Sequence, residues 1–393
     1  MSVFARFRRV ASDSGFLWAG TLALDRVAPF GALGWWRPCV VSPQRLGEQV
    51  AVVLKAWGMP PDHVAITTEK IVYADLRGID AHGCAMLPFY DELRSAGNLK
   101  PDATVGTVNE SEVMAVLDGG GGLGHVPGTM AMERAIEKCR STGVGIVTVR
   151  NSGHYGAAGA YAAMAAQHGL IGLTTTSTQT RSIVPTFGKT SLLGTNPLAF
   201  AAPTRRNRTF LLDMTTAAES FGTLLTLWRR GRRIPRGLAL DDRGRSVTNG
   251  RSAARYRRLL PLGSDRDRGS HKGYGLAVAV DILSAVLPGV ALASPEGGRR
   301  TRVGHFFLAL DPARFRDPSG FADDLDEWID TLHAVEPVDP EQPVLVAGDP
   351  EEDALAERSA HGIPLSRSVF EGIRAVARAC GAPFVLDRNL TSR

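Results

Sequence analysis

Cysteine is scarce in this sequence, which limits the kinds of site that it could build. Four cysteines occur in 393 residues, and they are scattered, without a C-x-x-C pair. The histidines form neither an H-x-x-x-H nor an H-E-x-x-H pattern. Both absences argue against a zinc site and against a disulfide framework. We therefore expect no bound metal and reduced thiols, as in a cytoplasmic protein, at Cys39, Cys84, Cys139 and Cys380.

Long apolar runs are also missing. No uninterrupted run approaches the roughly 20 residues of a membrane-spanning helix, so we expect no membrane segment. Residues 1–24 combine basic side chains with a short apolar patch, loosely like an export signal. No small-residue cleavage site follows, and Asp25 and Arg26 close the patch early. We expect residues 1–40 to be a poorly ordered extension, or the result of a start codon placed too far upstream, with export as the alternative.

Aromatic residues are few, at 7%, and acidic residues are rare between residues 229 and 272. That segment has 14 Lys and Arg against four Asp, which gives +10; the whole chain carries +5, so the remainder carries −5. A basic segment can bind nucleic acid or the phosphates of a cofactor. Tyr256 is its only aromatic residue and it shows no nucleic-acid motif, so base stacking lacks partners. We expect a solvated basic loop region and no nucleic-acid partner.

The remaining composition is that of a globular protein, with 44% hydrophobic and 22% charged residues, and the length allows two domains. Residues 41–80 show helical spacing that is interrupted at Pro60 and Pro61, and residues 87–95 form another helical run. From Val113 onward, short strand-like runs alternate with helices, which predicts an α/β layer arrangement. Further patterns predict helices over 274–287, 321–335 and 368–380 and a strand over 305–311.

The stretch GGGGLG, residues 119–124, follows the apolar run VMAVLD and matches the G-x-G-x-x-G pattern of Rossmann dinucleotide sites. In those sites the helix begins within the motif, so that its first N–H groups face the phosphates. Here Pro127 biases Val126 away from helical geometry, which predicts a helix start near Pro127 or later. The next strand-like run has no acidic residue at its end for a ribose, and Arg150 alone could pair with a 2′-phosphate. We therefore interpret GGGGLG as a loop between a strand and a helix.

Two histidines lie in glycine-flanked loops, His82 in RGIDAHGC and His154 in RNSGHYGAAG. His154 follows a strand-like run and precedes a helix, which is where α/β folds place ligands. Gly153 and Gly156 would let a ligand approach the backbone closely, and histidine exchanges protons near neutral pH. An isolated histidine can equally be structural. His154 is therefore the first candidate for an acid/base residue, and His82 is the second.

Taken in order, several segments resemble the malate/L-lactate dehydrogenase family, which lacks the Rossmann fold and includes sulfolactate, ureidoglycolate and cyclic-imine-2-carboxylate reductases. The resemblance covers Val41 to the C-terminus, in the segments ADLRGIDAHG, LPFYDELRSAGNLKP, VLDGGGGLG, GVGIVTVRNSGHYGAAGAYA, VPTFGKTSLLGTNPLAFAAP, LLDMTT, GSHKGYGLAVAVDIL and GHFFLALDP. It implies an α/β fold: a non-Rossmann NAD(P)-binding domain with a mixed, largely antiparallel sheet, plus a smaller helical domain. The regions expected are the extension (1–40), a helical substrate-side region (41–112), the NAD(P)-binding domain (113–312) and a C-terminal helical region that packs back on the N-terminal one (313–393).

The resemblance also implies an activity: reversible reduction of a 2-oxo acid or a cyclic imine acid with NAD or NADP, by a homodimer with active sites near the subunit interface. His154 matches the family's acid/base histidine, which protonates the carbonyl oxygen as hydride arrives. His82 matches the histidine of an S-H-G-V motif, and Tyr90 matches a pocket tyrosine. The residues that match cofactor-contacting stretches are Ser177, Thr178, Asp213, Met214, Thr215, Gly304, His305 and Phe306.

Several positions depart from the family pattern. Ala81 stands where a serine usually precedes the histidine, and Met86 stands where the family has its substrate-binding arginine. A methionine cannot clamp a carboxylate with two hydrogen bonds as a guanidinium does. Ala217 and Gly222-Thr223 replace a serine and a Gly-Lys pair. We expect a 2-hydroxy-acid dehydrogenase with altered substrate recognition; the alternative is a diverged, weakly active or inactive member that serves as a binding or structural dimer.

Overall fold

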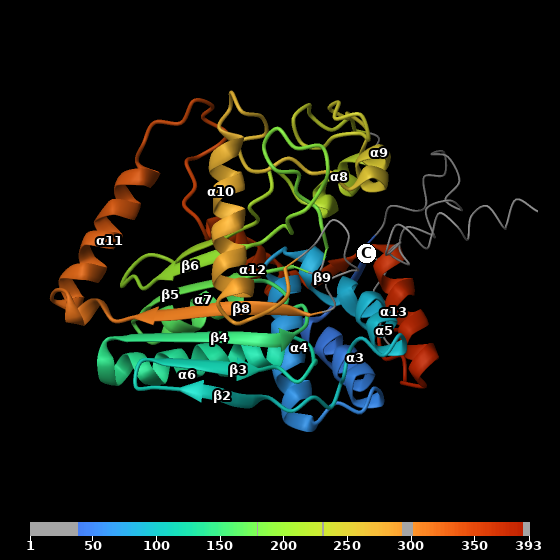
Figure 1. Cartoon of the computed structure of the whole chain (residues 1–393), viewed down its shortest axis with the longest axis horizontal. Coiled ribbons are helices and arrows are strands. Elements are labelled where there is room, and N and C mark those ends of the chain that lie inside the picture. The colour runs from blue at the N-terminus through green and yellow to red at the C-terminus, as the bar shows by residue number, and fades with distance from the viewer. Residues whose placement is uncertain (1–37, 179, 230–231, 293–301, 388–393) are drawn as a thin grey trace, which may run out of the picture.

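The computed structural model describes residues 38–178, 180–229, 232–292 and 302–387 (Figure 1). Residues 1–37 of the expected extension lie outside these ranges. Residues 39 and 40, which the expected boundary assigned to the extension, belong to strand β1 (Cys39–Val41). β1 pairs antiparallel with β9 (Ile363–Leu365), so the start of the described chain lies against its C-terminal region.

A seven-stranded sheet forms the centre of the fold, in the order β2-β3-β4-β8-β5-β6-β7. β3 and β4 run parallel, and the other neighbouring pairs in this sheet are antiparallel. The expected mixed, largely antiparallel sheet is therefore confirmed. The strands are β2 (Gly106–Glu110), β3 (Met114–Asp118), β4 (Val144–Ser152), β5 (Ile171–Thr176), β6 (Leu198–Ala202), β7 (Phe210–Met214) and β8 (Val303–Leu310).

The two faces of the sheet are covered differently, because successive side chains of a strand alternate between the faces. On one face, Val147 and Phe307 join an apolar core with α6 (His125–Thr142) and α7 (Gly159–Gln167). On the other face, α10 (Ser270–Asp281) crosses the strands in Figure 1 and continues as the π-helical turn η4 (Ile282–Val286). Glycine at position 304 permits the close approach of this turn, since a Cβ there would lie 2.2 Å from the Ser284 carbonyl oxygen.

The N-terminal helices form a second apolar core beside the sheet. α3 (Pro43–Ala56), α4 (Pro61–Leu76) and α5 (Leu87–Ser95) occupy the segments in which helical spacing predicted them. The C-terminal helix α13 (Arg367–Cys380) adds Phe370 and Ile373 to this core. Residues more than 300 positions apart in the chain therefore share one core, in which Leu46 and Phe370 are both buried.

The other C-terminal helices attach at different places. α11 (Pro318–His333) lies beside the β6–β7 loop, where the buried Asp326 accepts hydrogen bonds from the backbone N–H groups of residues 205–207. α12 (Asp349–His361) contacts α4 through the ion pair Arg77–Glu352, at 3.1 Å. The C-terminal region thus reaches both the sheet and the N-terminal helices.

The basic segment has more structure than the sequence predicted. It contains α9 (Gly250–Tyr256), which shares a small apolar core with Ile183, Leu259 and α8 (Phe221–Arg229), the helix that ends where the segment begins. Within its described residues, Arg245 and Arg258 both bond to Asp241. None of the helices in the described ranges is long and apolar enough to cross a membrane.

Three further expectations need correction. α6 begins at His125, with Gly124 as its N-cap, rather than near Pro127. Pro127 fits because the first turn of a helix has no internal partners for its N–H groups, so the missing donor costs nothing there. β2 lies before the boundary expected at residue 112, and it joins the sheet as the antiparallel neighbour of β3. The helix expected over 274–287 begins earlier, at Ser270, and ends in a π-helical turn.

Candidate active site

One edge of the sheet gathers most of the segments that the sequence singled out. In the pairing register, Ser152 lies opposite Val303 and Thr176 lies opposite His305. The carboxyl ends of β4 and β5 therefore meet the amino end of β8. β7 ends at the same edge, since its last residue pairs with the first residue of β6. The residues at or just beyond this edge include His154, Ser177, Thr178, Met214, Thr215, Gly304 and His305.

His154 follows β4 and is held by two hydrogen bonds to one ring nitrogen. Its Nδ1 lies 2.7 Å from the hydroxyl of Tyr90 on α5 and 3.3 Å from the backbone N–H of Gly156. An N–H group can only donate, so Nδ1 acts as the acceptor and the neutral ring carries its proton on Nε2. Tyr90 is fully buried, whereas His154 keeps part of its surface open. The pair therefore presents Nε2 as the working nitrogen.

His82 reaches His154 from the N-terminal helical region. The two imidazoles stack with their centroids 5.2 Å apart and their planes 20° from parallel. The loop that carries His82 is fixed by Asp75 at the end of α4, which accepts a hydrogen bond from the Cys84 N–H at 2.7 Å. Glycine at position 83 permits this contact, because a Cβ there would lie 2.0 Å from the Asp75 carboxylate. The structure thus brings together His82, Tyr90 and His154.

Burial keeps the imidazoles of this group neutral. It lowers the pKa of His82 from 6.5 to about 4, and it lowers the pKa of His154 well below 6.5, with repulsion from neighbouring imidazoles adding to the shift. Burial also raises the pKa of Tyr90 above its usual 10, so its hydroxyl keeps its proton. To accept a proton from a substrate hydroxyl on Nε2 at neutral pH, the neutral ring must hold its own proton on Nδ1, where the Tyr90 oxygen can accept it.

His125 belongs to the same group of rings, although no sequence pattern pointed to it. It is the first residue of α6, is fully buried, and meets the ring of Tyr90 edge-on at a centroid distance of 5.8 Å. Neither of its ring nitrogens has a hydrogen-bond partner in the described part of the chain. Burial, the charge of Lys70 and the proximity of His82 lower its pKa to about 3. In the sequence, His125 directly follows GGGGLG, where the glycines dominate the pattern.

Met86 lies in the apolar core formed by the N-terminal helices, and only 5% of it is exposed. It precedes α5, one helical turn before Tyr90, so the two residues lie on the same side of that helix. Met86 can therefore contribute an apolar contact but no charge. At another departure from the family pattern, position 223, the Thr223 hydroxyl bonds to the Ser220 hydroxyl at the start of α8.

Two of the predicted cofactor residues interlock across the sheet edge. The Ser177 hydroxyl accepts a hydrogen bond from the Gly304 N–H at 3.1 Å, and the Ser177 N–H donates to the Gly304 carbonyl at 3.1 Å. His305 is fully buried and uses both ring nitrogens within the protein, one on the Thr176 hydroxyl at 2.7 Å and one on the Ser152 hydroxyl at 2.8 Å. Its imidazole therefore crosslinks β4, β5 and β8, and Phe306 beside it is also buried.

The other predicted cofactor residues lie on β7 and after β5. Asp213 accepts a hydrogen bond from the Gly159 N–H at the start of α7, at 2.7 Å, and its pKa is raised to about 6 by burial. Thr215 donates to the Thr195 carbonyl at 2.8 Å, which fixes the LLGTNP turn against the end of β7. Met214 is the last residue of β7, and Thr178 lies against Gly194, where a Cβ would come within 1.9 Å of the threonine hydroxyl.

The glycine cluster is closed to a phosphate. The N–H groups of Gly119 and Gly121 donate to the carbonyls of Arg150 and Asn151, and that of Gly124 donates to the carbonyl of His154. Arg150 itself pairs with Asp118, at 3.1 Å, rather than being free for a 2′-phosphate. The cluster therefore lies between a strand and a helix, as expected, and its N–H groups hold the loop that carries His154.

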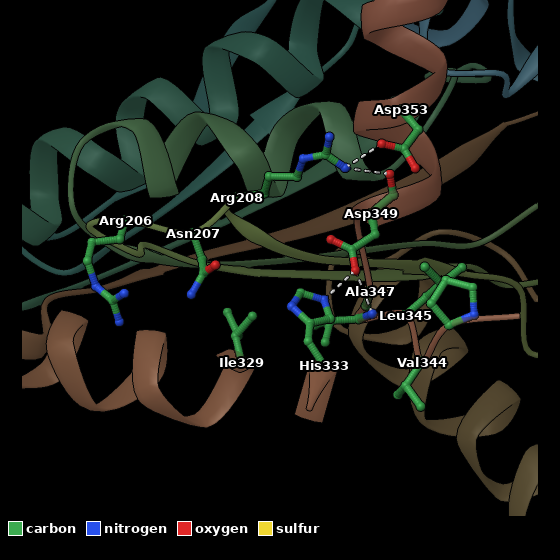
Figure 2. A pocket seen from close by; sticks show the side chains of 12 residues that line it. Arg206, Asn207, Arg208, Ile329, His333, Val344, Leu345, Ala347, Asp349 and Asp353 are labelled. Carbon is green, nitrogen blue, oxygen red and sulfur yellow. Dashed lines mark hydrogen bonds and ion pairs between the residues drawn. The ribbon is translucent and has the colours of Figure 1, made fainter. Parts of the chain in front are cut away.

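A cavity of about 420 Å³ opens elsewhere, between the β6–β7 loop, α11 and the start of α12 (Figure 2). None of its lining residues belongs to the group of rings around His154. Two pairs of its polar side chains bond to each other, Arg208 with Asp353 at 2.7 Å and His333 with Asp349 at 2.7 Å, and Arg206 pairs with Asp330 at 2.8 Å. Within the described residues, no group of three or more His, Cys, Asp or Glu side chains is placed to hold a metal ion.

Comparison with known proteins identifies the class. The sequence pattern of the malate/L-lactate dehydrogenase family matches residues 41–374, and the chain belongs to this family, whose members are NAD(P)-dependent 2-hydroxy-acid dehydrogenases. It is 37% identical over 350 residues to malate dehydrogenase of Pyrococcus horikoshii, covering 87% of this chain and 95% of that protein. It is 34% identical over 350 residues to L-sulfolactate dehydrogenase of Methanocaldococcus jannaschii, covering 87% and 97%.

The fold comparison agrees. The crystal structure of the malate dehydrogenase from Pyrococcus horikoshii matches 91% of this chain and 99% of its own, with a TM-score of 0.80 and 32% sequence identity. The resemblance inferred from the ordered segments is therefore confirmed, for both the family and the fold.

Proposed function

We propose that this chain interconverts a 2-oxo acid and a 2-hydroxy acid with NAD or NADP, and that His154 is the acid/base. The observation that carries the proposal is the pair of hydrogen bonds from Tyr90 and Gly156 to Nδ1 of His154. They fix the ring at the edge of the sheet and leave Nε2 for the substrate. The family is consistent with this, since the two relatives named above are both dehydrogenases by name.

In the reducing direction, protonated His154 gives its Nε2 proton to the carbonyl oxygen, which becomes the hydroxyl. In the oxidising direction, the neutral ring, with its own proton on Nδ1, takes that proton back on Nε2. The Tyr90 hydroxyl holds the ring in place: it donates to Nδ1 when the ring proton is on Nε2, and its oxygen accepts from Nδ1 when the proton is there. His82, stacked on the other side, limits the freedom of the imidazole and lines the approach to it.

The edge of the sheet offers a polar atom that fits a nicotinamide cofactor. Among the described residues near this edge, the buried Oδ1 of Asn196 has no hydrogen-bond partner. Such an atom is costly unless a ligand or water satisfies it. When bound, the cofactor supplies or accepts the hydride at the substrate carbon. The residues that we assign to holding it are Ser177, Thr178, Asp213, Met214, Thr215, Gly304, His305 and Phe306; His305 does so by supporting the strand ends, because both of its nitrogens are occupied.

A second candidate function has a specific observation behind it. Position 86 holds a buried methionine, and position 223 a threonine bonded within its own helix. These residues favour a diverged, weakly active or inactive member that acts as a binding or structural protein. In both cases we propose a homodimer in the cytoplasm.

Titration with NADH, followed by nicotinamide fluorescence, tests the two candidates. Saturable binding followed by NADH consumption with a panel of 2-oxo acids is expected of the enzyme, and the same panel with NADPH gives the cofactor preference. Absence of saturable NADH binding would contradict the proposed dehydrogenase activity. Saturable binding without turnover of any acid would support the inactive member instead.

A further inference from the structure

His125 is an unusual residue to bury without partners. A neutral imidazole has one donor and one acceptor nitrogen, and leaving either of them unpaired in the interior is destabilising. Both nitrogens of His125 are unpaired, and its side chain is fully buried. His82 also has an unpaired buried nitrogen, Nδ1. Three unsatisfied imidazole nitrogens therefore lie in the group of rings around Tyr90.

The backbone at Gly156 links His125 to the working histidine. The Gly156 N–H donates to Nδ1 of His154, and a Cβ at position 156 would lie 2.9 Å from Nε2 of His125 and 3.8 Å from the His82 carbonyl oxygen. A glycine at this position leaves Nε2 of His125 uncovered by any side chain of residue 156. It also sets the three histidines around one short piece of backbone.

The electrostatic surroundings of His125 suit an anion. Besides burial, the Lys70 ammonium and the neighbouring His82 imidazole lower the pKa of His125, because each disfavours a positive charge on its ring. Lys70 is itself buried; its Nζ pairs at 2.9 Å with Glu69, whose side chain is largely exposed, and lies 5.8 Å from the centre of the Tyr161 ring. A buried positive charge close to an imidazole with an unused N–H favours a negatively charged acceptor at that N–H.

The substrate supplies such an acceptor. In a 2-oxo acid the carboxylate is attached to the carbonyl carbon, so an acid whose carbonyl oxygen meets His154 carries its carboxylate into the same group of rings. Met86, on the Tyr90 side of α5, brings no cation to receive it. We propose that His125 binds the carboxylate of the substrate by donating its ring N–H. This assignment rests on the proposed 2-oxo acid chemistry at His154.

The test compares His125→Ala and His125→Gln with the wild type, using the 2-oxo acid that the panel identifies and its primary amide. Losing a hydrogen bond to a charged group is expected to lower kcat/KM for the acid by about 10- to 150-fold, mainly through KM. The amide, which lacks the charge, should be affected much less, so the preference for acid over amide should shrink at least about tenfold in His125→Ala. Glutamine retains an N–H donor, so His125→Gln should recover part of that preference.

His168→Ala serves as the matched control, because His168 is exposed at the end of α7 and bonds only to Arg140. Melting temperature and NADH affinity show whether each variant is folded. An unchanged acid-over-amide preference in folded His125→Ala would overturn the assignment, as would a loss confined to kcat. A wild type that binds NADH but reduces no 2-oxo acid would instead contradict the proposed function, and this assignment with it.

Discussion

At the scale of single residues, the chemistry depends on which nitrogen of His154 is free. Tyr90 and Gly156 both engage Nδ1, so proton transfer is left to Nε2. The tyrosine comes from a helix that is 64 residues earlier in the chain, which means that the N-terminal region helps to orient an imidazole carried by the sheet. Orientation and proton transfer are therefore separable functions of two different residues.

Replacing these two residues should separate the functions. His154→Ala should reduce kcat by at least about 100-fold, because a positioned acid/base contributes about 10²–10⁴-fold, while NADH affinity stays close to that of the wild type. Tyr90→Phe keeps the ring but removes the hydroxyl, so kcat should fall less than in His154→Ala. Steady-state kinetics and NADH fluorescence check both. Near-normal turnover of His154→Ala would show that another residue is the acid/base.

The lowered pKa of His154 predicts opposite pH profiles for the two directions. Burial pushes this pKa well below 6.5, so the ring is neutral across the neutral range. Oxidation of a 2-hydroxy acid needs the neutral ring, and its kcat/KM should stay level from pH 8 down past 6.5 and fall only in more acidic solution. Reduction needs the protonated ring, so its kcat/KM should rise as the pH falls. Rates measured between pH 5 and 9 check this; a fall in the oxidation rate that begins above pH 6.5 would contradict it.

Some residues of the site could be found from sequence and others could not. His154 and His82 stood out because glycines flank them and because a strand-like run leads into His154. His125 gave no such signal, because its importance comes from two unpaired nitrogens, a property of the folded surroundings. His305 was predicted to contact the cofactor. Nothing in the surrounding sequence indicated that both of its ring nitrogens would form hydrogen bonds that connect three strands.

At the scale of elements, the glycine cluster shows how one sequence pattern can serve two structures. G-x-G-x-x-G lies between β3 and α6, and these are followed by a strand parallel to β3, as in a dinucleotide-binding unit. The difference is that N–H groups of these glycines donate hydrogen bonds to the carbonyls of residues 150, 151 and 154, and are not free to bind a phosphate. Glycines are needed here because residues 150–154, at and just after the end of β4, pass close to them.

Gly124 is the position at which this close passage should be most sensitive. A Cβ there would lie 2.4 Å from the Gly153 carbonyl oxygen and 2.7 Å from the Tyr155 Cβ. Gly124→Ala should lower the free energy of unfolding by about 1–3 kcal/mol and reduce kcat, since it displaces the residues beside His154. Gly106→Ala in β2 is the control, with nothing within 4 Å of the new carbon, and should change stability by about 0.5 kcal/mol or less. Chemical denaturation measures both, and equal effects would contradict the packing argument.

Long periodic segments were predicted well, and short ones poorly. α3, α4, α5 and α13 bury one regular apolar stripe each, which sequence spacing reveals directly. β9 has three residues, and its pairing with β1 depends on a partner more than 300 positions away. The start of α6 was placed too late because Pro127 was treated as a boundary, although the first turn of a helix tolerates proline.

At the scale of the whole molecule, the C-terminal region supports the site without contributing a reacting group. Arg358 on α12 donates to the Asp75 carbonyl and to the Asp80 carboxylate, and 15% of its side chain is exposed. Asp75 in turn holds the loop that carries His82. The stacking of His82 on His154 is therefore backed by a residue from the far end of the chain.

Removal of this support should weaken the site more than removal of a comparable ion pair elsewhere. Arg358→Ala should lower kcat/KM several-fold, because the His82 loop loses one of its anchors. Arg374→Ala, which breaks the pairs with Glu371 and Asp387 near the end of α13, is the control and should change kcat/KM little. Kinetics with melting temperatures of both variants give the comparison. An equal loss of kcat/KM in the two would mean that the C-terminal region acts through overall stability alone.

The pairing of β1 with β9 also bears on how the chain folds while it is being synthesised on the ribosome. The helices of residues 43–95 leave the ribosome early, but their core is complete only when residues 363–386 arrive. At about 5–20 residues per second, the roughly 270 residues between them take on the order of 13–54 seconds to make. During that interval the apolar stripes of α3 and α5 lack their final partner, α13. The growing chain is thus a natural client for chaperones that shield the first helices until the last one is made.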